Sequence, residues 1–330
     1  MITRTDVAKH AGVSKTLVSR VLNNSGYVST ENRKKVEAAI KELGYTPNLI
    51  ARSLKTRKTH QILFYARELS NPFFTEVYEG MEDYAEKLGY TIVVSSHFNP
   101  QMIAQRQFDG IILSHIPPNF TEELLKLGVP TVVTDYSGKA LPFPSVGIDI
   151  ESGTVQAIHY LSSQGHAHIA FLANSPDPAD LRYQGFVKGL SECCPMLNPE
   201  NLIFTANSPT YYHRGYDAAK QLKKNLSISA VFTFNDAMAI GAMAALSEEG
   251  IPIPEAVSII GFDNILQAEF TAPPLTTVSI PKYDQGWESA KMLLKIIQGE
   301  KVQPITLETQ LILRNSVKKV NTVAGNQILC

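Results

Sequence analysis

The sequence lacks the features that mark secreted or membrane-bound chains. It contains three cysteines, with Cys193 and Cys194 adjacent and Cys330 at the end. This spacing forms neither a disulfide framework nor a metal-ligand set, and it favours a reducing cytoplasm. No apolar run reaches the length of a membrane span, and no apolar region of a signal peptide follows the first residues. We therefore predict a cytoplasmic protein without a membrane association.

The common catalytic signatures are also missing. The sequence has no Gly-x-Gly-x-x-Gly after a strand, no phosphate-binding loop, no Gly-x-Ser-x-Gly and no His-Glu-x-x-His. His166 and His168 lie close together at a turn, but no Cys, Asp or Glu stands within a few residues to complete a metal site. We interpret both as solvated turn histidines and predict no metal, no cofactor and no enzymatic activity. An uncommon active site is the alternative, because fold does not decide function.

Charge, in contrast, is distributed very unevenly. The 330 residues carry a net charge of -1, from 30 Lys and Arg against 31 Asp and Glu. Residues 1–60 hold 12 Lys and Arg against 4 Asp and Glu, so this segment carries +8 and the remainder -9. A basic segment on an acidic body is the electrostatic signature of a nucleic-acid-binding module. The length predicts two or three domains, and the composition is that of a globular protein.

Residues 6–23 predict two short helices joined by a tight turn. Gly12 lies in the turn, where the backbone needs a residue that tolerates a positive φ. Ser14 is placed to cap the second helix with its hydroxyl. One face of this second helix is polar and carries Lys15, Thr16, Ser19 and Arg20. A short, capped helix with a basic N-terminal end suits the major groove of DNA, although a helical pair with a glycine turn is also common without DNA binding.

A third helix and a basic segment follow. The helix is expected to begin after Ser29 or Thr30 and to end at Gly44. In the next segment, Thr46 and Pro47 predict a helix start, but the helix would be too short to be stable alone and could order on docking. Leu54 stands there among basic residues, which suits a wedge for the minor groove. The alternative is a flexible basic linker with Leu54 packed on a neighbour.

From residue 61 onward, short apolar runs alternate with segments of helical spacing. This alternation predicts a parallel sheet covered by helices, and its repetition predicts two similar α/β halves that close around a cleft. Strands are expected over 62–66, 91–95, 110–113, 131–133, 146–148, 168–172, 202–204, 230–233 and 257–262, with a final one near 309–313. Helices are expected over 73–88, 122–127, 154–164, 181–193, 212–224, 237–249 and 283–298.

Aromatic and polar residues follow several of the expected strands. They are Phe73, Phe74, Asp149, Arg182, Asn235 and Asp263. Carboxylates, an amide and a guanidinium that converge on a cleft can satisfy the hydroxyls of a sugar, and aromatic faces stack on a sugar or a base. Two alternatives stay open, because Phe74 could belong to the core and an Asp at a strand end often caps the next helix.

Several of these stretches resemble the lac repressor/galactose repressor family of bacterial regulators. They are residues 6–8, 11–14, 18–23, 44–48, 51–54, 235–239 and 261–263. The resemblance covers nearly the whole chain and implies an all-α helix-turn-helix DNA-binding head on a periplasmic-binding-protein-like α/β body of two doubly wound parallel-sheet subdomains. It also implies that the connection between Phe98 and Phe108, which is short for the family, holds a trimmed helix.

The resemblance further implies three regions. A DNA-binding domain would span 1–47, a hinge helix and linker 48–58, and an effector-binding and dimerisation domain 59–330. In that last domain, the N-subdomain would take about 59–153 plus 281–306, and the C-subdomain about 154–280 plus 307–330. The chain would cross back so that the last helix joins the first half and the final strand joins the second.

By the same resemblance, roles can be assigned to individual residues. Base edges would be contacted by Lys15, Thr16 and Arg20, with Ser19 beside them. Phosphates would be held by Ser14, Asn23, Tyr27 and Tyr45, and the hinge would use Asn48, Ala51, Arg52 and Leu54. Effector ligands would be Arg182, Asn235 and Asp263, then Phe73, Phe74 and Asp149, with Tyr211 as a second aromatic wall. Leu17 stands where the family usually has Thr; it would contact a thymine methyl if it faced the DNA, or it would pack inward or lose one phosphate contact.

The sequence therefore predicts a cytoplasmic, homodimeric transcriptional repressor that binds a palindromic operator and is released by a small sugar. A first alternative is a DNA-binding regulator controlled by a corepressor, either a purine-like ligand or a partner protein. A second alternative is a sugar-binding receptor without a DNA function.

Overall fold

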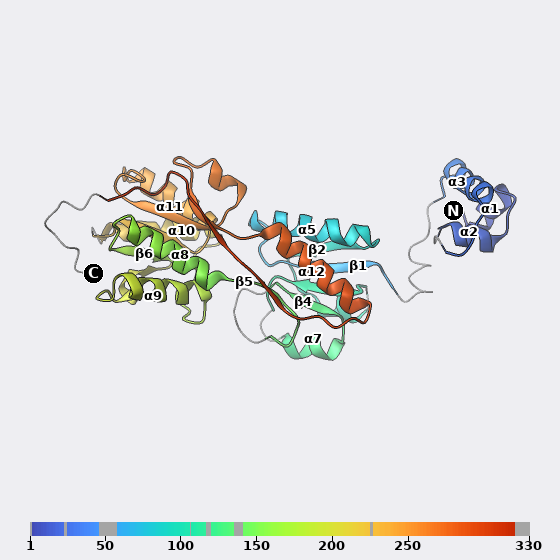
Figure 1. Cartoon of the computed structure of the whole chain (residues 1–330), viewed down its shortest axis with the longest axis horizontal. Helices are drawn as coiled ribbons and strands as arrows, with labels where there is room; N and C mark the ends of the chain where they lie inside the picture. The colour runs from blue at the N-terminus through green and yellow to red at the C-terminus, as the bar shows by residue number, and fades with distance from the viewer. Residues whose placement is uncertain are drawn as a thin grey trace. The chain divides into compact units, whose positions relative to one another are not determined.

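The computed structural model describes residues 2–22, 25–45, 58–105, 107–116, 120–134, 141–224 and 227–320. The chain forms two compact units, Met1–Thr59 and His60–Cys330, which we call the head and the body (Figure 1). Several predictions lie outside the described residues: the segment that begins at Thr46 and Pro47, with the hinge residues Asn48, Ala51, Arg52 and Leu54, and the phosphate contact Asn23.

The head consists of three short helices with well-formed ends. They are α1 (Arg4–His10), α2 (Lys15–Leu22) and α3 (Thr30–Leu43). The Ser14 hydroxyl accepts the Leu17 N–H at 3.2 Å at the start of α2, and Ser29 caps α3 in the same way. Gly12 and Gly44 have φ values of +65° and +59°, a region that glycine enters at little cost. The predicted turn and both helix caps are confirmed.

The head has a small apolar core of its own. It is made by Val7, Ala8, Val18, Val21, Val36, Ala39 and Tyr45. Leu17 packs against this core from α2, so the interpretation that it points inward is confirmed. Burial of this one face leaves the opposite face of α2 to polar side chains.

The first half of the body, which we call the N-half, is built on a parallel four-stranded sheet in the order β2-β1-β3-β4. Its strands are β1 (Gln61–Tyr65), β2 (Thr91–Ser95), β3 (Gly110–Leu113) and β4 (Thr131–Val133). Its helices are α5 (Phe73–Lys87), α6 (Pro100–Ala104) and α7 (Thr121–Leu127). The five residues of α6 confirm the trimmed helix that was expected between Phe98 and Phe108.

The second half, the C-half, has a six-stranded sheet in the order β12-β10-β9-β8-β6-β7. Its strands are β6 (Ile169–Leu172), β7 (Ile203–Phe204), β8 (Ala230–Thr233), β9 (Ser258–Asp263), β10 (Thr276–Ser279) and β12 (Gln310–Ile312), the last antiparallel to β10. Its α-helices are α8 (Ile150–Ser163), α9 (Leu181–Cys193), α10 (Tyr211–Ala219) and α11 (Asp236–Glu248). Short 3₁₀ helices are η1 (Pro199–Leu202), η2 (Lys220–Lys224) and η3 (Leu266–Glu269), and η2 replaces the end of the helix expected over 212–224.

The chain crosses between the halves more than once. Helix α12 (Lys282–Ile297) follows β10 but packs on α5 in the N-half, whereas β12 joins the C-half sheet (Figure 1). The crossing implied by the family resemblance is thus present. Strand β5 (Val146–Ile148) was predicted, but β10, β11 (Ile305–Leu307) and the parallel pairing of β5 with β11 were not. Helix α8 starts at Ile150 and packs on α9, so the expected subdomain boundary at 153 falls within this helix.

The prediction that His166 is a solvated turn histidine is wrong. Its side chain is buried, not solvated, since its Nε2 donates to the carbonyl oxygen of Lys318 at 3.1 Å and its Nδ1 lies 3.0 Å from Ser229 Oγ. Burial lowers the pKa of this imidazole. The C-terminal segment covers the turn, which local spacing could not show. Within the described ranges, no group of three His, Cys, Asp or Glu could hold a metal ion, and no helix is long and apolar enough to cross a membrane.

Candidate ligand cleft and DNA-binding surface

The body contains a cavity of about 500 Å³ lined by residues of both halves. This volume is in the usual range for small-molecule sites. Six of the seven predicted ligand residues line it: Phe73, Phe74, Arg182, Tyr211, Asn235 and Asp263. They come from segments that follow strands of the two sheets, as expected for open α/β sheets.

Asp149 is the predicted ligand that the structure does not bring to the cavity. Its carboxylate accepts the N–H of Ser152 at 3.2 Å and caps α8. Its backbone carbonyl accepts the hydroxyl of Thr309 at 3.3 Å. An Asp that follows a strand can either cap the next helix or bind a ligand. At position 149 the structure shows the helix cap.

Arg182 is the most distinctive group of the cavity. Its guanidinium carbon lies 4.4 Å from the ring centre of Phe234 and 4.5 Å from that of Phe262. Nη2 is 3.6 Å from Asp263 Oδ1, and the side chain is only 7% exposed. Among the described residues, its Nε is the buried side-chain polar atom without a hydrogen-bond partner. A buried N–H that lacks an acceptor costs about 1–3 kcal/mol, so a ligand that supplies an acceptor would gain this energy.

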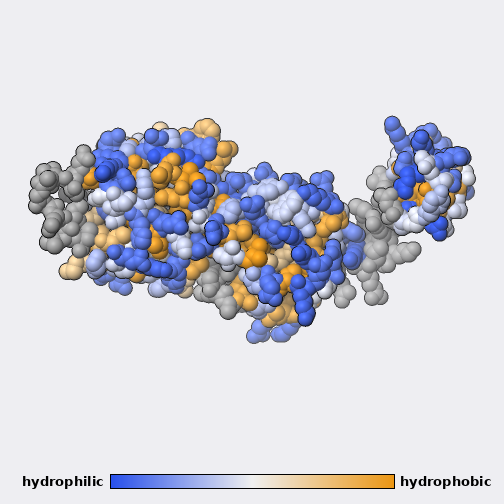
Figure 2. Space-filling view, viewed as in Figure 1, coloured by the Kyte–Doolittle hydropathy of each residue, from blue (hydrophilic) through white to orange (hydrophobic). Residues whose placement is uncertain are grey.

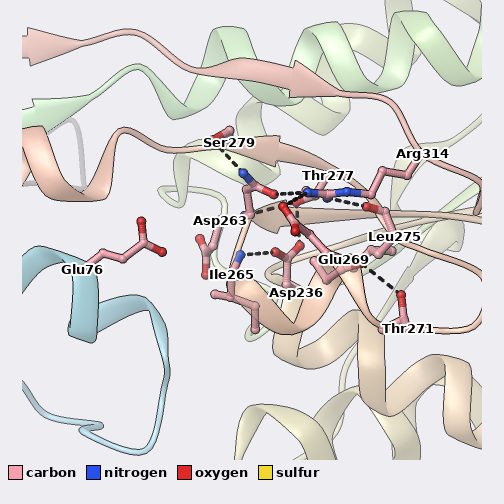
Figure 3. Close-up of polar contacts among 12 residues, drawn as sticks. Glu76, Asp236, Asp263, Ile265, Glu269, Thr271, Leu275, Thr277, Ser279 and Arg314 are labelled. Carbon is pink, nitrogen blue, oxygen red and sulfur yellow. Dashed lines mark hydrogen bonds and ion pairs between the residues drawn. The ribbon is translucent and has the colours of Figure 1, made fainter.

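Asp263 is paired with a second buried carboxyl behind it. Asp236 accepts the hydroxyl of Thr277 at 2.6 Å and the N–H of Ile265 at 2.8 Å (Figure 3). Burial raises the pKa of Asp236 to about 8, and the nearby Asp263 adds to this rise. Burial also raises the pKa of Asp263 to about 7, although Arg182 and Lys282 oppose the rise. A carboxyl that titrates near neutral pH can accept or donate a hydrogen bond to a ligand.

The rest of the C-half wall combines an amide with an aromatic pair. Asn235 caps α11 through its Oδ1, which accepts the Met238 N–H at 2.9 Å and thereby fixes the side chain. The Tyr211 ring stacks on Phe234, with 5.8 Å between ring centres and 21° between planes. The second aromatic wall predicted at Tyr211 is therefore present in the cavity.

The N-half wall mixes aromatic and charged groups. Phe74 makes edge contacts with Phe64 of the core and with Phe73, and it lines the cavity as well, so the same ring packs on the core and faces the cavity. The cavity is also lined by Arg67, Glu68 and His115, which were not predicted. They follow β1 and β3, so the strand-end rule that selected Asp263 would have found them too.

Burial affects the titration of these missed residues. It raises the pKa of Glu68, while Arg214 and the backbone N–H of Tyr211 oppose the rise. It lowers the pKa of His115, and Arg67 contributes to the lowering. The N-half wall therefore offers charges of both signs in a partly buried setting.

The head presents a compact polar surface on α2. Lys15, Thr16 and Arg20 are exposed, as the DNA-reading role requires, and Ser19 is half-buried. Tyr27 is 88% exposed, which suits the predicted phosphate contact. Tyr45 differs from expectation, because it is buried in the head core and its ring stabilises the packing of the helices.

A helix-turn-helix head and a two-half body around a polar cleft define a class of protein: a DNA-binding regulator with an effector site. A family model described as bacterial regulatory proteins, lacI family, matches residues 3–48. A second model, a periplasmic binding protein-like domain, matches residues 158–317.

Comparison with known proteins agrees over nearly the full length. The HTH-type transcriptional repressor PurR of Vibrio atlanticus (strain LGP32) is 35% identical over 339 residues, covering 97% of this chain and all of PurR. The lac repressor dimer bound to operator and the anti-inducer ONPF matches with a TM-score of 0.81 at 27% identity, over 96% of this chain and 99% of that one. The complex of the regulator CelR with cellobiose matches with a TM-score of 0.71 at 30% identity, over 96% and 100%.

The chain belongs to the lacI family of bacterial transcriptional regulators. It is thus a DNA-binding transcription regulator with an effector-binding body, as the sequence analysis predicted.

Proposed function

We propose that this chain is a cytoplasmic repressor that a small sugar releases from its operator. The observation that carries the proposal is the unpaired Nε of Arg182, held beside Asp263 in a cavity of about 500 Å³. A sugar offers closely spaced hydroxyls that both donate and accept, which matches a guanidinium next to a carboxyl. The cellobiose complex of CelR supports this ligand class.

The DNA contacts are proposed on the exposed face of α2. Lys15, Thr16 and Arg20 would contact base edges, with Ser14, Ser19 and Tyr27 around them. The charge of +8 on residues 1–60 supports strong phosphate attraction, so operator binding should fall steeply with salt concentration. The predicted hinge contacts of Asn48, Ala51, Arg52 and Leu54, and the phosphate contact of Asn23, are part of the same proposal.

A homodimer follows from the need for two heads on a palindromic site. The described part of the body exposes large apolar side chains around η3, where Leu266 is 65% and Phe270 79% exposed. Figure 2 shows apolar surface over the C-half on the face in view. Neighbouring exposed apolar side chains can mark an interaction site, and we propose that a second copy covers Leu266 and Phe270. Sedimentation of Phe270→Glu should show a monomer where the unchanged chain is a dimer.

The control mechanism requires differential binding. A sugar can shift the DNA affinity only if it binds two arrangements of the body with different affinities. By thermodynamic reciprocity, operator DNA must then change the sugar affinity by the same factor.

The test is selection of genomic DNA fragments by the purified full-length chain, with and without a panel of sugars and nucleobases. An enriched palindrome that one sugar releases supports the proposal, and Arg20→Ala should abolish the enrichment. Enrichment that a nucleobase strengthens would instead favour the corepressor alternative, for which the stacked Tyr211 and Phe234 are the supporting observation. Binding of a sugar without any DNA enrichment would favour a receptor.

A further inference from the structure

Lys282 is a buried lysine at the junction of the two halves. Its side chain is 2% exposed, and it opens α12. The Nζ donates to the backbone carbonyls of Asp263 at 2.8 Å and Asn264 at 2.7 Å, and it lies 3.3 Å from Glu76 Oε1. An ammonium group has three N–H donors; two of them are used by these carbonyls, and the Glu76 carboxylate balances the charge.

The three acceptors belong to both halves of the body. Asp263 and Asn264 lie at the end of β9 in the C-half, whereas Glu76 lies in the first turn of α5 in the N-half. In Figure 3, Glu76 and Asp263 project toward one another from these two elements. Lys282 therefore ties the turn that carries Asp263 to the helices of the N-half.

The turn that Lys282 holds has a strained backbone. Asp263 and Asn264 have φ values of +110° and +54°. Non-glycine residues rarely adopt such conformations, which persist only where their surroundings impose them. On the C-half side, Asp236 accepts the N–H of Ile265 and Arg314 donates to Asn264 Oδ1 at 2.9 Å. On the N-half side, Lys282 holds both carbonyls of the turn.

The N-half end of this link is rigid. A Cβ at Gly80 of α5 would lie 2.0 Å from the carbonyl oxygen of Tyr283, and one at Gly286 of α12 would lie 1.9 Å from that of Val77. The two helix backbones therefore touch, and the pair must move as one piece. Because α5 also carries Phe73 and Phe74, the link runs from one wall of the cavity to the other.

We propose that Lys282 is a positioning residue that couples the state of Asp263 in the cleft to the arrangement of α5 and α12. This inference rests on the proposed effector-controlled function. A rotation of one half against the other must either carry the Asp263–Asn264 turn along or break two charge-assisted hydrogen bonds and strand a buried charge. Lys282 thus makes the Asp263–Asn264 turn move together with α5 and α12. An uncharged side chain at this position would let the turn move independently of these helices.

The test uses operator DNA as the probe, so no identified sugar is needed. Amide hydrogen exchange is measured on the full-length chain with and without the palindromic duplex from the selection. In the unchanged chain, the duplex should alter exchange at residues 263–265 and 73–77 by roughly fivefold or more, the lower range of ordinary coupling between sites. In Lys282→Met, the duplex should still bind and alter exchange at residues 73–77. Its effect on exchange at residues 263–265 should fall to less than half of that in the unchanged chain.

Lys291→Met is the matched control, because Lys291 lies on the same helix and pairs with Glu288, three residues earlier on it. It should keep the full duplex effect at 263–265. Glu76→Gln is the second variant, since Glu76 is 45% exposed and should tolerate the change even if Lys282→Met fails to fold. It should give an intermediate effect, because both carbonyl bonds remain.

Two results would overturn the coupling role. One is a duplex effect at residues 263–265 that is the same in the unchanged chain, Lys282→Met and Glu76→Gln, as expected of a lysine with a purely structural role. The other is a duplex that binds the unchanged chain without any effect at these residues. A failure of the proposed function is distinct from both, since the unchanged chain would then select no duplex at all.

Discussion

The two walls of the cavity are built in different ways. On the C-half wall, Arg182, Asn235 and Asp263 are buried, and each is fixed by a helix cap, an aromatic cage or a strand end. On the N-half wall, Arg67 is exposed and Glu68 and His115 are half-buried, in segments between strands and helices. The proposed function extends this contrast: the C-half would supply fixed hydrogen-bonding groups that hold the ligand, and the N-half would supply an adjustable surface that selects it.

The largest effect should come from the buried carboxyl behind the C-half wall. Because burial raises the pKa of Asp236 from 3.8 to about 8, the folded chain binds a proton that the unfolded chain releases between these values. The free energy of unfolding must therefore fall as pH rises through this window, by at most about 1.4 kcal/mol per pH unit. Asp236→Asn cannot titrate, so its stability relative to the unchanged chain should improve as pH rises.

Urea unfolding between about pH 5 and pH 8 checks this, because that range lies within the titration window of Asp236. Fluorescence of the single Trp, Trp287 on α12, reports on the body alone. Asp177→Asn is the control, because Asp177 lines the same cavity but is exposed, and it should show no pH-dependent gain. If the difference in unfolding free energy between Asp236→Asn and the unchanged chain stays constant with pH, then Asp236 does not hold a buried proton in the folded chain.

The next largest effect concerns Arg182. Arg182→Lys keeps the charge but loses the planar group between Phe234 and Phe262 and the unpaired Nε. Affinity for the sugar found in the panel should fall by about 2 kcal/mol, roughly 30-fold, measured by calorimetry. Arg214→Lys is the control, since its donors are already used by Asn174 and the Ser208 carbonyl. Equal losses in both variants would contradict a special role for the caged guanidinium.

The same contrast explains what the sequence could predict. Arg182, Asn235 and Asp263 lie next to strands and helices with strong periodicity, so their place in the cavity could be predicted. Arg67, Glu68 and His115 also follow strands, so their position makes them candidates, but their side chains carry no pattern that separates a cavity wall from a solvated loop. Most strands were predicted to within a residue or two because their apolar runs are continuous, as buried parallel strands require.

Tertiary pairing accounts for the rest. Strand β11 forms against β5, which is more than a hundred residues earlier, and His166 is covered by the segment around Lys318. Neither leaves a local trace in the sequence. The positive φ of Asp263 is also imposed from outside, since Asp236, Lys282 and Arg314 all hold the turn that it begins.

A smaller effect is expected on the N-half wall. Phe74→Leu keeps most of the apolar volume against Phe64 but removes the ring that faces the cavity. Sugar affinity should fall by about 1 kcal/mol, roughly fivefold, and the order of preference among sugars in the panel should change. Phe98→Leu is the control, because Phe98 packs on Tyr65 and Phe120 outside the cavity lining. An unchanged order of preference in Phe74→Leu would contradict the selective role of this wall.

The smallest effect on the ligand should come from Asp149, which the sequence favoured as a ligand and the structure assigns to the cap of α8. Asp149→Ala removes the acceptor for the Ser152 N–H, so the free energy of unfolding should fall by about 1 kcal/mol. Asp149→Asn can still cap the helix and should stay close to the unchanged chain, because Asn and Asp are equally good at this position. Sugar affinity should be the same in both variants. A loss of sugar affinity in Asp149→Asn without a loss of stability would show that the Asp149 carboxylate contributes to ligand binding. Residues between the two halves would then bind the ligand together with the hydrogen-bonding C-half wall and the selective N-half wall.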